Sequence, residues 1–250
     1  ALTEADSIAT GPTAWGEWKA YLVETLAEAT ADYISSDGVT RLKRRSFVTE
    51  ELESLMAEGE TVVQGSGDTV TIVAPDRAGT FSRAAGALAL RGLDVLQADA
   101  YSSDAGMAVS RFRVAEPDTP VDWTRVTEDV HRCLHGRLAI DARIAERARV
   151  YRRRAALSAK SVTTRVTFDI ESATDATIVE VRTEDHIGVL YHLTRALAEM
   201  GLDIRSAKIQ TISNEVVDTF YVTSSNGPTL EEQHCREIEA ALRHSLTRVD

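Results

Sequence analysis

One stretch of this chain occurs twice. It reads DRAGTFSRAAGALALRGLDV from Asp76 to Val95 and DHIGVLYHLTRALAEMGLDI from Asp185 to Ile204. In each copy an apolar strand leads into a turn with a glycine, a helix follows, and a second glycine ends the helix before a new strand begins. Two copies this far apart in the chain predict two similar small domains rather than a solenoid.

The sequence around each copy extends the same pattern. In the first repeat, a strand at 70–73 precedes the turn, strands at 93–101 and 107–114 follow the helix, and a helix runs over 123–134. In the second repeat, the corresponding segments are 177–181, 202–212, 215–223 and a last helix over 230–246. Each unit therefore has the order βαββα, which is typical of a ferredoxin-like α+β sandwich with two helices on one face of a sheet.

A ferredoxin-like sheet needs a fourth strand, and little chain follows the last helix. Leading strands at 61–64 and 166–170 precede the two repeats. We expect these leading strands to fill the fourth place in each of the two sheets, which would be a circularly permuted strand order.

The remaining segments complete the expected domain organisation. Helical periodicity over 12–33 and 47–56 predicts a helical segment at 1–58, followed by a first domain at 60–135, a basic helical linker at 136–162 and a second domain at 163–250. The linker has an apolar stripe of Ile140, Ile144, Ala148 and Tyr151 beside many arginines. It is either a connecting helix with a solvated face or a surface that docks on an acidic partner.

Composition excludes several classes of function. The formal net charge of −11 argues against nucleic-acid binding, because an acidic surface repels phosphates. No apolar run is long enough to span a membrane, and no secretory leader is recognisable, so we expect a cytoplasmic protein. Cys133 and Cys235 are expected to be reduced thiols, because two cysteines beside single histidines are too few for a metal site.

The repeated turn has two interpretations. A glycine between a strand and a helix lets the backbone approach a ligand, the helix start offers unpaired N–H groups to a carboxylate, and an aspartate three residues earlier can accept an ammonium group. Together these features would hold an α-amino acid. Alternatively, Asp76 and Asp185 cap the helices and the glycines serve tight packing.

The pattern D-x-x-G-x-[FL] at a helix start, followed by G-L-D-[VI] and a hairpin, resembles the ACT domain, a family of small ligand-sensing modules attached to metabolic enzymes. The similarity covers about 60–135 and 165–246, although Ala78 and Ile187 stand where members often have proline. ACT domains bind amino acids at the turn, often between two domains. The resemblance implies these ligand-binding residues: Asp76, Arg77, Gly79, Thr80, Asp185, His186, Gly188, Val189 and Leu190.

A narrower resemblance is to the C-terminal region of bacterial PII uridylyltransferase/uridylyl-removing enzymes. It rests on VVDTFYV at 216–222 and on the opening LTEADSIATGP followed by W-x-x-W-K, which looks like the end of the HD domain of those enzymes. Asp6 would then match the last metal ligand of that domain. Its partner ligands are not in this sequence, so Asp6 would be an orphan, and one carboxylate cannot hold a catalytic metal.

This resemblance implies a regulatory region that senses glutamine and controls, by allostery, the transfer and removal of a uridylyl or adenylyl group on the nitrogen-signalling protein PII. The parent enzyme would need magnesium or another divalent metal, whereas this part would carry no cofactor and no catalytic residue. A homodimer through the ACT domains is also possible on this interpretation. The alternative is a free-standing ACT-repeat amino-acid-binding regulator. The second repeat is closer to the family pattern, since it keeps Asp185, His186 and Asp218, and is expected to bind better.

Overall fold

The computed structural model describes residues 47–116, 119–155, 162–170, 175–212 and 215–247, with the side chains of 151–155 and of 212 left aside. The helix expected over 12–33 and Asp6 lie outside these residues. Residues from Val48 onward form one compact unit, to which the two repeats belong.

The first repeat follows the expected order closely. After α3 (Glu50–Ala57) come the strands β1 (Val62–Ser66) and β2 (Thr69–Pro75), the helix α4 (Thr80–Arg91), the strands β3 (Val95–Ser102) and β4 (Met107–Val114), and the helix α5 (Trp123–Leu134). The strand β1 runs through Gly65 and Ser66, and Gly67 and Asp68 alone connect it to β2. The Cβ of any other residue at position 65 would meet the Trp123 ring at 2.2 Å, so Gly65 permits this packing.

The linker and the second repeat are equally regular. The helix α6 (Ile140–Ala155) leads to the strands β5 (Arg165–Asp169) and β6 (Thr177–Glu184), the helix α7 (Val189–Glu199), the strands β7 (Leu202–Ile212) and β8 (Glu215–Ser224), and the helix α8 (Glu232–Thr247). The βαββα order of both units is therefore confirmed.

The leading strands fill the fourth place in each half of the sheet. The strand order is β1-β2-β4-β3-β7-β8-β6-β5, and every pair is antiparallel. Because β1 lies beside β2 and β5 beside β6, each half has the ferredoxin-like order with its outer strand supplied from the start of the unit. The permuted order is confirmed.

The two halves of the sheet are joined at its centre. The strands β3 and β7 pair through Gln97 with Lys208, Ala98 with Ala207, and Asp99 with Ser206, which joins both halves into one eight-stranded sheet. The physical reason is that β3 and β7 would otherwise be edge strands with unpaired backbone groups. The two repeats of one chain therefore pair with each other.

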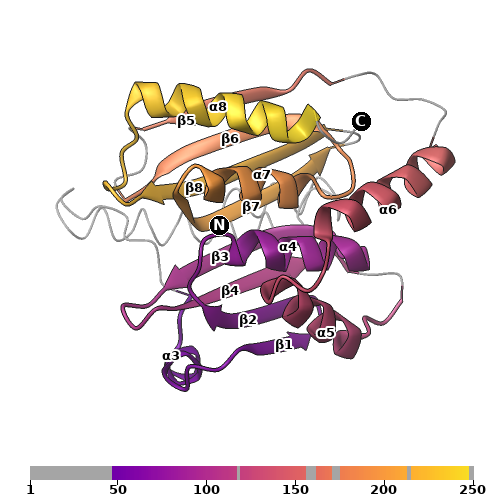
Figure 1. Cartoon of the computed structure of the whole chain (residues 1–250), viewed down its shortest axis with the longest axis vertical. Helices are drawn as coiled ribbons and strands as arrows, with labels where there is room; N and C mark the ends of the chain where they lie inside the picture. Colours follow the sequence, from indigo (N-terminus) through magenta and orange to yellow (C-terminus); the bar gives the residue numbers. More distant parts are fainter. Residues whose placement is uncertain (1–46, 117–118, 156–161, 171–174, 213–214, 248–250) are drawn as a thin grey trace, which may run out of the picture. The chain divides into compact units, whose positions relative to one another are not determined.

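The helices α4, α5, α7 and α8 lie on one face of the sheet, with α4 and α7 side by side at its centre (Figure 1). Their apolar sides and the inward strand residues form one core that spans both repeats, with Phe112 and Phe220 fully buried in it. The helix α3 instead packs against β2 and β4, with Leu52 and Met56 buried.

The linker helix α6 belongs to this core as well. It packs against α4, and Ile140, Ile144 and Ala148 are almost fully buried. These are the stripe residues noted in the sequence, so the first half of α6 is a covering element of the helical layer rather than a spacer. Its far end extends beyond the sheet (Figure 1).

Candidate functional site

The first repeated turn is open. Gly79 has a φ of +82° and occupies the N-cap position of α4, and a Cβ there would find only Ser82 Oγ, at 3.4 Å. Asp76 and Arg77 are exposed, and the backbone N–H of Asp76 donates to the carbonyl of Gly106 at 2.8 Å. Thr80 is buried and its hydroxyl donates to the carbonyl of Pro75 at 3.3 Å.

The second repeated turn has the same backbone but is covered. Gly188 has a φ of +91° at the N-cap of α7, and a Cβ there would lie 2.5 Å from Ile144 Cγ2 of α6. Val189 is buried and Leu190 is half-buried. His186 is half-buried, with Nδ1 3.0 Å from the carbonyl oxygen of Glu184.

Neither aspartate caps its helix. At both turns the N-cap residue is the glycine, and no side chain accepts a hydrogen bond from the helix start there. The capping interpretation of Asp76 and Asp185 is therefore wrong: the turn places each aspartate three residues before the cap position. The first amide of each helix is already used within the turn, because Thr80 N–H donates to the carbonyl of Arg77 at 2.9 Å and Val189 N–H to the carbonyl of His186 at 3.2 Å. Only the amides that follow them at each helix start remain for a ligand.

A cavity of about 390 Å³ opens beside the first turn. It is lined by residues of that turn and α4, of the α5–α6 connection, and of α7, namely Ala78, Gly79, Ser82, Arg83, Cys133, Gly136, Leu138, Ala139, Ile140, Asp141, Tyr191, Arg195, Ala198 and Glu199. The starts of α4 and α6 and the end of α7 thus meet around one hollow. Helix starts carry partial positive charge and helix ends partial negative charge, so both ends of a zwitterion find a complement here.

Arg195 of α7 organises the wall of this cavity. It forms an ion pair with Asp141 of α6 and another with Glu199, at 3.1 Å, and its guanidinium carbon lies 5.7 Å from the centre of the Tyr191 ring. Burial is the main cause that raises the pKa of the Tyr191 hydroxyl. The cavity wall therefore contains a held cation, two carboxylates and a neutral phenol.

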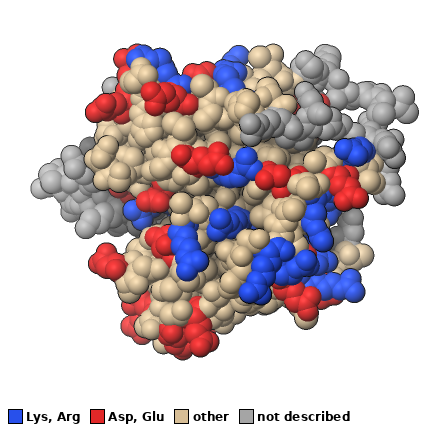
Figure 2. All heavy atoms as spheres, viewed as in Figure 1, with Lys and Arg blue, Asp and Glu red and all other residues tan. Residues whose placement is uncertain are grey.

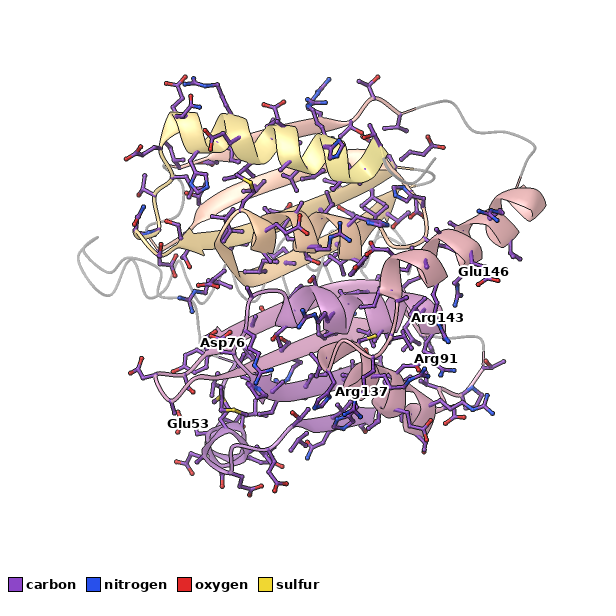
Figure 3. All side chains as sticks on the ribbon, viewed as in Figure 1. Glu53, Asp76, Arg91, Arg137, Arg143 and Glu146 are labelled. Atoms are coloured by element: carbon purple, nitrogen blue, oxygen red, sulfur yellow. The ribbon has the colours of Figure 1, made fainter. Side chains whose placement is uncertain are left out.

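Arginine side chains gather over α5 and α6 on the helical face, where Arg91, Arg137 and Arg143 are labelled (Figures 2 and 3). Burial and then the charge of Asp129 raise the pKa of the Cys133 thiol, which lines the cavity, to about 12, and the charges of Arg132, Arg143 and Arg83 only partly oppose this rise. Cys133 is therefore a neutral thiol, and of these three arginines only Arg83 lines the cavity.

The second turn has a different set of charged groups. The carboxyl group of Asp185 has a raised pKa, first because it is partly buried and then because Asp94 of the first repeat adds a negative charge, although the residue as a whole is exposed. Burial also lowers the pKa of His192 to about 4, so this imidazole is neutral at pH 7. Asp94, which follows α4, and Asp185, which precedes α7, are thus close enough for their charges to interact.

Asp218 is the most unusual polar residue of the second repeat. It is fully buried on β8, opposite Val181 of β6 and Ile209 of β7, and neither of its carboxyl oxygens has a hydrogen-bond partner in the described part of the chain. Burial and then the charge of Asp185 raise the pKa of Asp218 well above its usual value. A buried carboxyl group without a partner is stable only when it is protonated or when a cation binds beside it.

The sequence-derived residues fall into two groups that the fold keeps apart. Because α4 and α7 run in opposite directions, the first turn lies beside the end of α7, and the second lies beside the end of α4. Sequence reasoning missed Asp141, Tyr191, Arg195 and Glu199 as cavity residues. The stripe on α6 was visible, but its packing against α4 and the second turn was not.

Two absences concern the described residues only. They contain no group of three or more histidine, cysteine, aspartate or glutamate side chains arranged to hold a metal ion. Within the same ranges, no helix has both the length and the apolar composition that crossing a bilayer requires.

Comparison with known proteins adds a relationship in sequence. No model of a known protein family matches the chain. A bifunctional uridylyltransferase/uridylyl-removing enzyme from Streptomyces coelicolor is 28% identical over 98% of this chain, and one from Ruegeria pomeroyi is 34% identical over 69% of it. A solved structure of an unknown protein from Galdieria sulphuraria covers 72% of this chain and 91% of its own, with 15% identity and a TM-score of 0.24, too low to support an argument.

The similarity covers only part of these relatives. This chain spans 35% of the length of the Streptomyces coelicolor enzyme and 32% of that of an enzyme with the same name from Cereibacter sphaeroides, which is 27% identical over 98% of this chain. The expected resemblance is confirmed. Nearly the whole chain is similar to a part of bifunctional uridylyltransferase/uridylyl-removing enzymes that makes up about one third of their length.

Proposed function

We propose that this chain is the ligand-sensing regulatory part of a nucleotidyltransferase similar to the uridylyltransferase/uridylyl-removing enzymes, and that a small amino acid binds in the cavity beside the first turn. Glutamine is the first candidate. PII would be reached through the catalytic part of such an enzyme, where a divalent metal would also act. The two free cysteines suit the reducing cytoplasm.

One observation carries the proposal: two helix starts and one helix end meet around a cavity between the repeats. The backbone N–H groups at the starts of α4 and α6, with Arg83, would receive the carboxylate of the ligand. Glu199 and Asp141, near the end of α7, would receive its ammonium group. Leu138 and Tyr191 would contact the side chain.

A ligand in this cavity would touch both repeats and the linker helix. Regulation requires that the ligand bind one arrangement of these elements better than another. The contact between Asp141 of α6 and Arg195 of α7 is the element that a bound zwitterion would change most directly, because both partners line the cavity.

A matched pair of substitutions tests the site. Ala139 and Ala142 are exposed residues three positions apart at the start of α6, but Ala139 lines this cavity and Ala142 lines a neighbouring hollow between α6, α7 and α8. Ala139→Trp should abolish glutamine binding measured by calorimetry on the whole chain, whereas Ala142→Trp should leave it unchanged. Equal affinity in both variants would rule out the cavity.

The charge requirement is tested separately. Arg83→Gln removes one positive charge from the cavity wall and should weaken binding of an amino acid about tenfold or more. The same amino acid with its α-carboxylate replaced by an amide should bind equally well to the unaltered protein and to Arg83→Gln. If none of the common amino acids binds the unaltered chain, the proposal fails.

A further inference from the structure

A group of arginines covers one part of the helical face, over α4, α5 and the start of α6. Figure 2 shows their blue side chains gathered there, and Figure 3 labels three of them close together. We call the group the arginine surface, and it consists of Arg83 and Arg91 of α4, Arg132 of α5, Arg137 of the α5–α6 connection and Arg143 of α6.

The contacts of these arginines show that they are neighbours in space. The charges of Arg83, Arg132 and Arg143 all act on the thiol of Cys133, so the three guanidinium groups lie around one residue. The first and last members of the chain of contacts are also tied to α5, because Arg91 pairs with the same aspartate as Arg132 and the backbone N–H of Arg137 donates to the carbonyl of Arg132 at 2.8 Å.

Most of this positive charge is not neutralised by the described part of the chain. Arg83, Arg137 and Arg143 form no ion pair with any carboxylate there, and the other two arginines share the buried carboxylate of Asp129, at 2.6 Å and 3.4 Å. Neighbouring like charges repel each other, so this arrangement opposes folding rather than favouring it. Stability therefore does not explain why the arginines are gathered here.

The helices of the second repeat are different. Their arginines are each paired with carboxylates, in the pairs Arg195 with Asp141 and Glu199, Arg236 with Glu232, and Arg243 with Glu239. When the two repeated turns are aligned, Arg83 and Arg91 correspond to His192 and Met200, and burial keeps His192 neutral by lowering its pKa to about 4. The arginine surface is thus a property of the first repeat and not of the fold.

The charge of the whole chain limits what this surface can bind. The formal net charge is −11, so a long polyanion such as a nucleic acid would be repelled by the rest of the molecule. An acidic area on another protein presents carboxylates over a limited surface instead. All five residues are arginines, whose planar guanidinium groups match carboxylates and which are enriched at protein interfaces. Only Arg83 also lines the cavity, so the group does not converge on one small molecule.

We propose that the arginine surface is a docking site for an acidic protein surface. Carboxylates of the partner would form bidentate pairs with Arg137 and Arg143, which are exposed and have no partner among the described residues. Asp129 holds Arg91 and Arg132 beside them. This proposal goes beyond the proposed function and does not depend on it, and it selects one of the two interpretations that the sequence leaves open for the linker.

The test measures binding of an acidic polypeptide to the whole chain. Fluorescence anisotropy of labelled poly-L-glutamate is recorded with the unaltered protein, with Arg137→Gln combined with Arg143→Gln, and with the same two positions changed to lysine. Arg236→Gln combined with Arg243→Gln is the matched control, because it removes the same charge from exposed positions of α8. Thermal unfolding checks that each variant is folded.

We expect the unaltered protein to bind poly-L-glutamate with an affinity that falls as salt is added. The double glutamine variant at Arg137 and Arg143 should bind about tenfold or more weakly, whereas the control on α8 should stay within about twofold of the unaltered protein. The double lysine variant should bind more tightly than the glutamine variant, because it keeps the charge but not the fork of donors.

Three results would overturn the proposal. The first is the absence of binding to poly-L-glutamate at low salt. The second is an equal loss in the two glutamine variants, because binding would then follow net charge and not this surface. The third is a DNA duplex that binds more tightly than poly-L-glutamate and is lost in the variant at Arg137 and Arg143. Amino-acid binding is measured separately, so the proposed function can fail while docking holds, and the reverse.

Discussion

Replacing Gly188 with alanine should destabilise the protein more than the same change at Gly79. Both glycines have a left-handed backbone, with φ of +91° and +82°, so each substitution carries a similar backbone cost of about 1–2 kcal/mol. At Gly79 the new methyl group meets only Ser82 Oγ at 3.4 Å. At Gly188 it meets Ile144 Cγ2 at 2.5 Å, which requires a neighbour to move.

Ile144 cannot relieve this collision by turning aside. A β-branched side chain in a helix has one strongly preferred χ1 rotamer, and Cγ2 is attached directly to Cβ. The helix α6 must therefore shift, and overpacking of this kind costs about 1–3 kcal/mol. We expect Gly79→Ala to lose about 1–2 kcal/mol and Gly188→Ala about 2–5 kcal/mol of unfolding free energy.

Chemical denaturation and thermal unfolding measure the difference between the two variants. For a chain of this size, about 1 kcal/mol corresponds to a Tm change of roughly 2–4 °C, so Gly188→Ala should melt several degrees below Gly79→Ala. Combining Gly188→Ala with Ile144→Ala should cost less than the sum of the two single changes, by about 1 kcal/mol or more, because the new methyl group enters vacated space. Equal losses for the two glycines, together with additive losses in the double variant, would refute the contact.

Three further predictions concern buried charges. The folded pKa of Asp218 is raised, so its carboxyl group favours folding most below its unfolded pKa of about 3.8 and loses that contribution as the pH rises through its folded pKa. Asp218→Asn should therefore gain stability relative to the unaltered protein as the pH rises from acid to neutral. A difference in unfolding free energy that stays constant over that range would contradict this. The folded pKa of His192 is lowered from 6.5 to about 4, so its contribution to stability is present above pH 6.5 and is lost as the pH falls towards 4. His192→Gln should therefore make the unfolding free energy less dependent on pH on the acid side. An NMR titration midpoint of His192 near 6.5 would exclude this account. Asp129 of α5 is almost fully buried and pairs with Arg91 of α4 at 2.6 Å, so Asp129→Ala should lose about 1–3 kcal/mol of unfolding free energy in denaturation experiments. The pair between Arg236 and Glu232 is exposed, so replacing Glu232 should change the unfolding free energy by less than about 1 kcal/mol.

Much of the fold could be predicted from the sequence, because local rules govern it. The alternation of apolar residues set the strands, the three- and four-residue spacing set the helices, and glycines marked the turns and helix ends. Even the permuted position of β1 and β5 followed from counting strands. The doubled turn with Gly79 and Gly188 was visible for the same reason: only glycine adopts its left-handed backbone at little cost.

The pairing of β3 with β7 could not be predicted, because an edge strand has the same sequence pattern whether it pairs within a chain, between chains or not at all. That pairing places α4 beside α7 in opposite directions and so creates the cavity with Asp141, Arg195 and Glu199. None of these residues stands out in the sequence, since each is an ordinary charge on a helix.

Asp218 shows where the boundary between sequence and structure lies. The alternation of Val216, Asp218, Phe220 and Val222 already placed an aspartate among residues that face the core, so its burial was determined by the sequence. Whether that carboxyl group has a partner depends on residues far apart in the chain, and the tertiary structure gives it none among those described. The same is true of the two turns. Their sequences make them alike, and only the packing of Ile144 from α6 against Gly188 makes them different, because a single linker helix can cover one turn and not both.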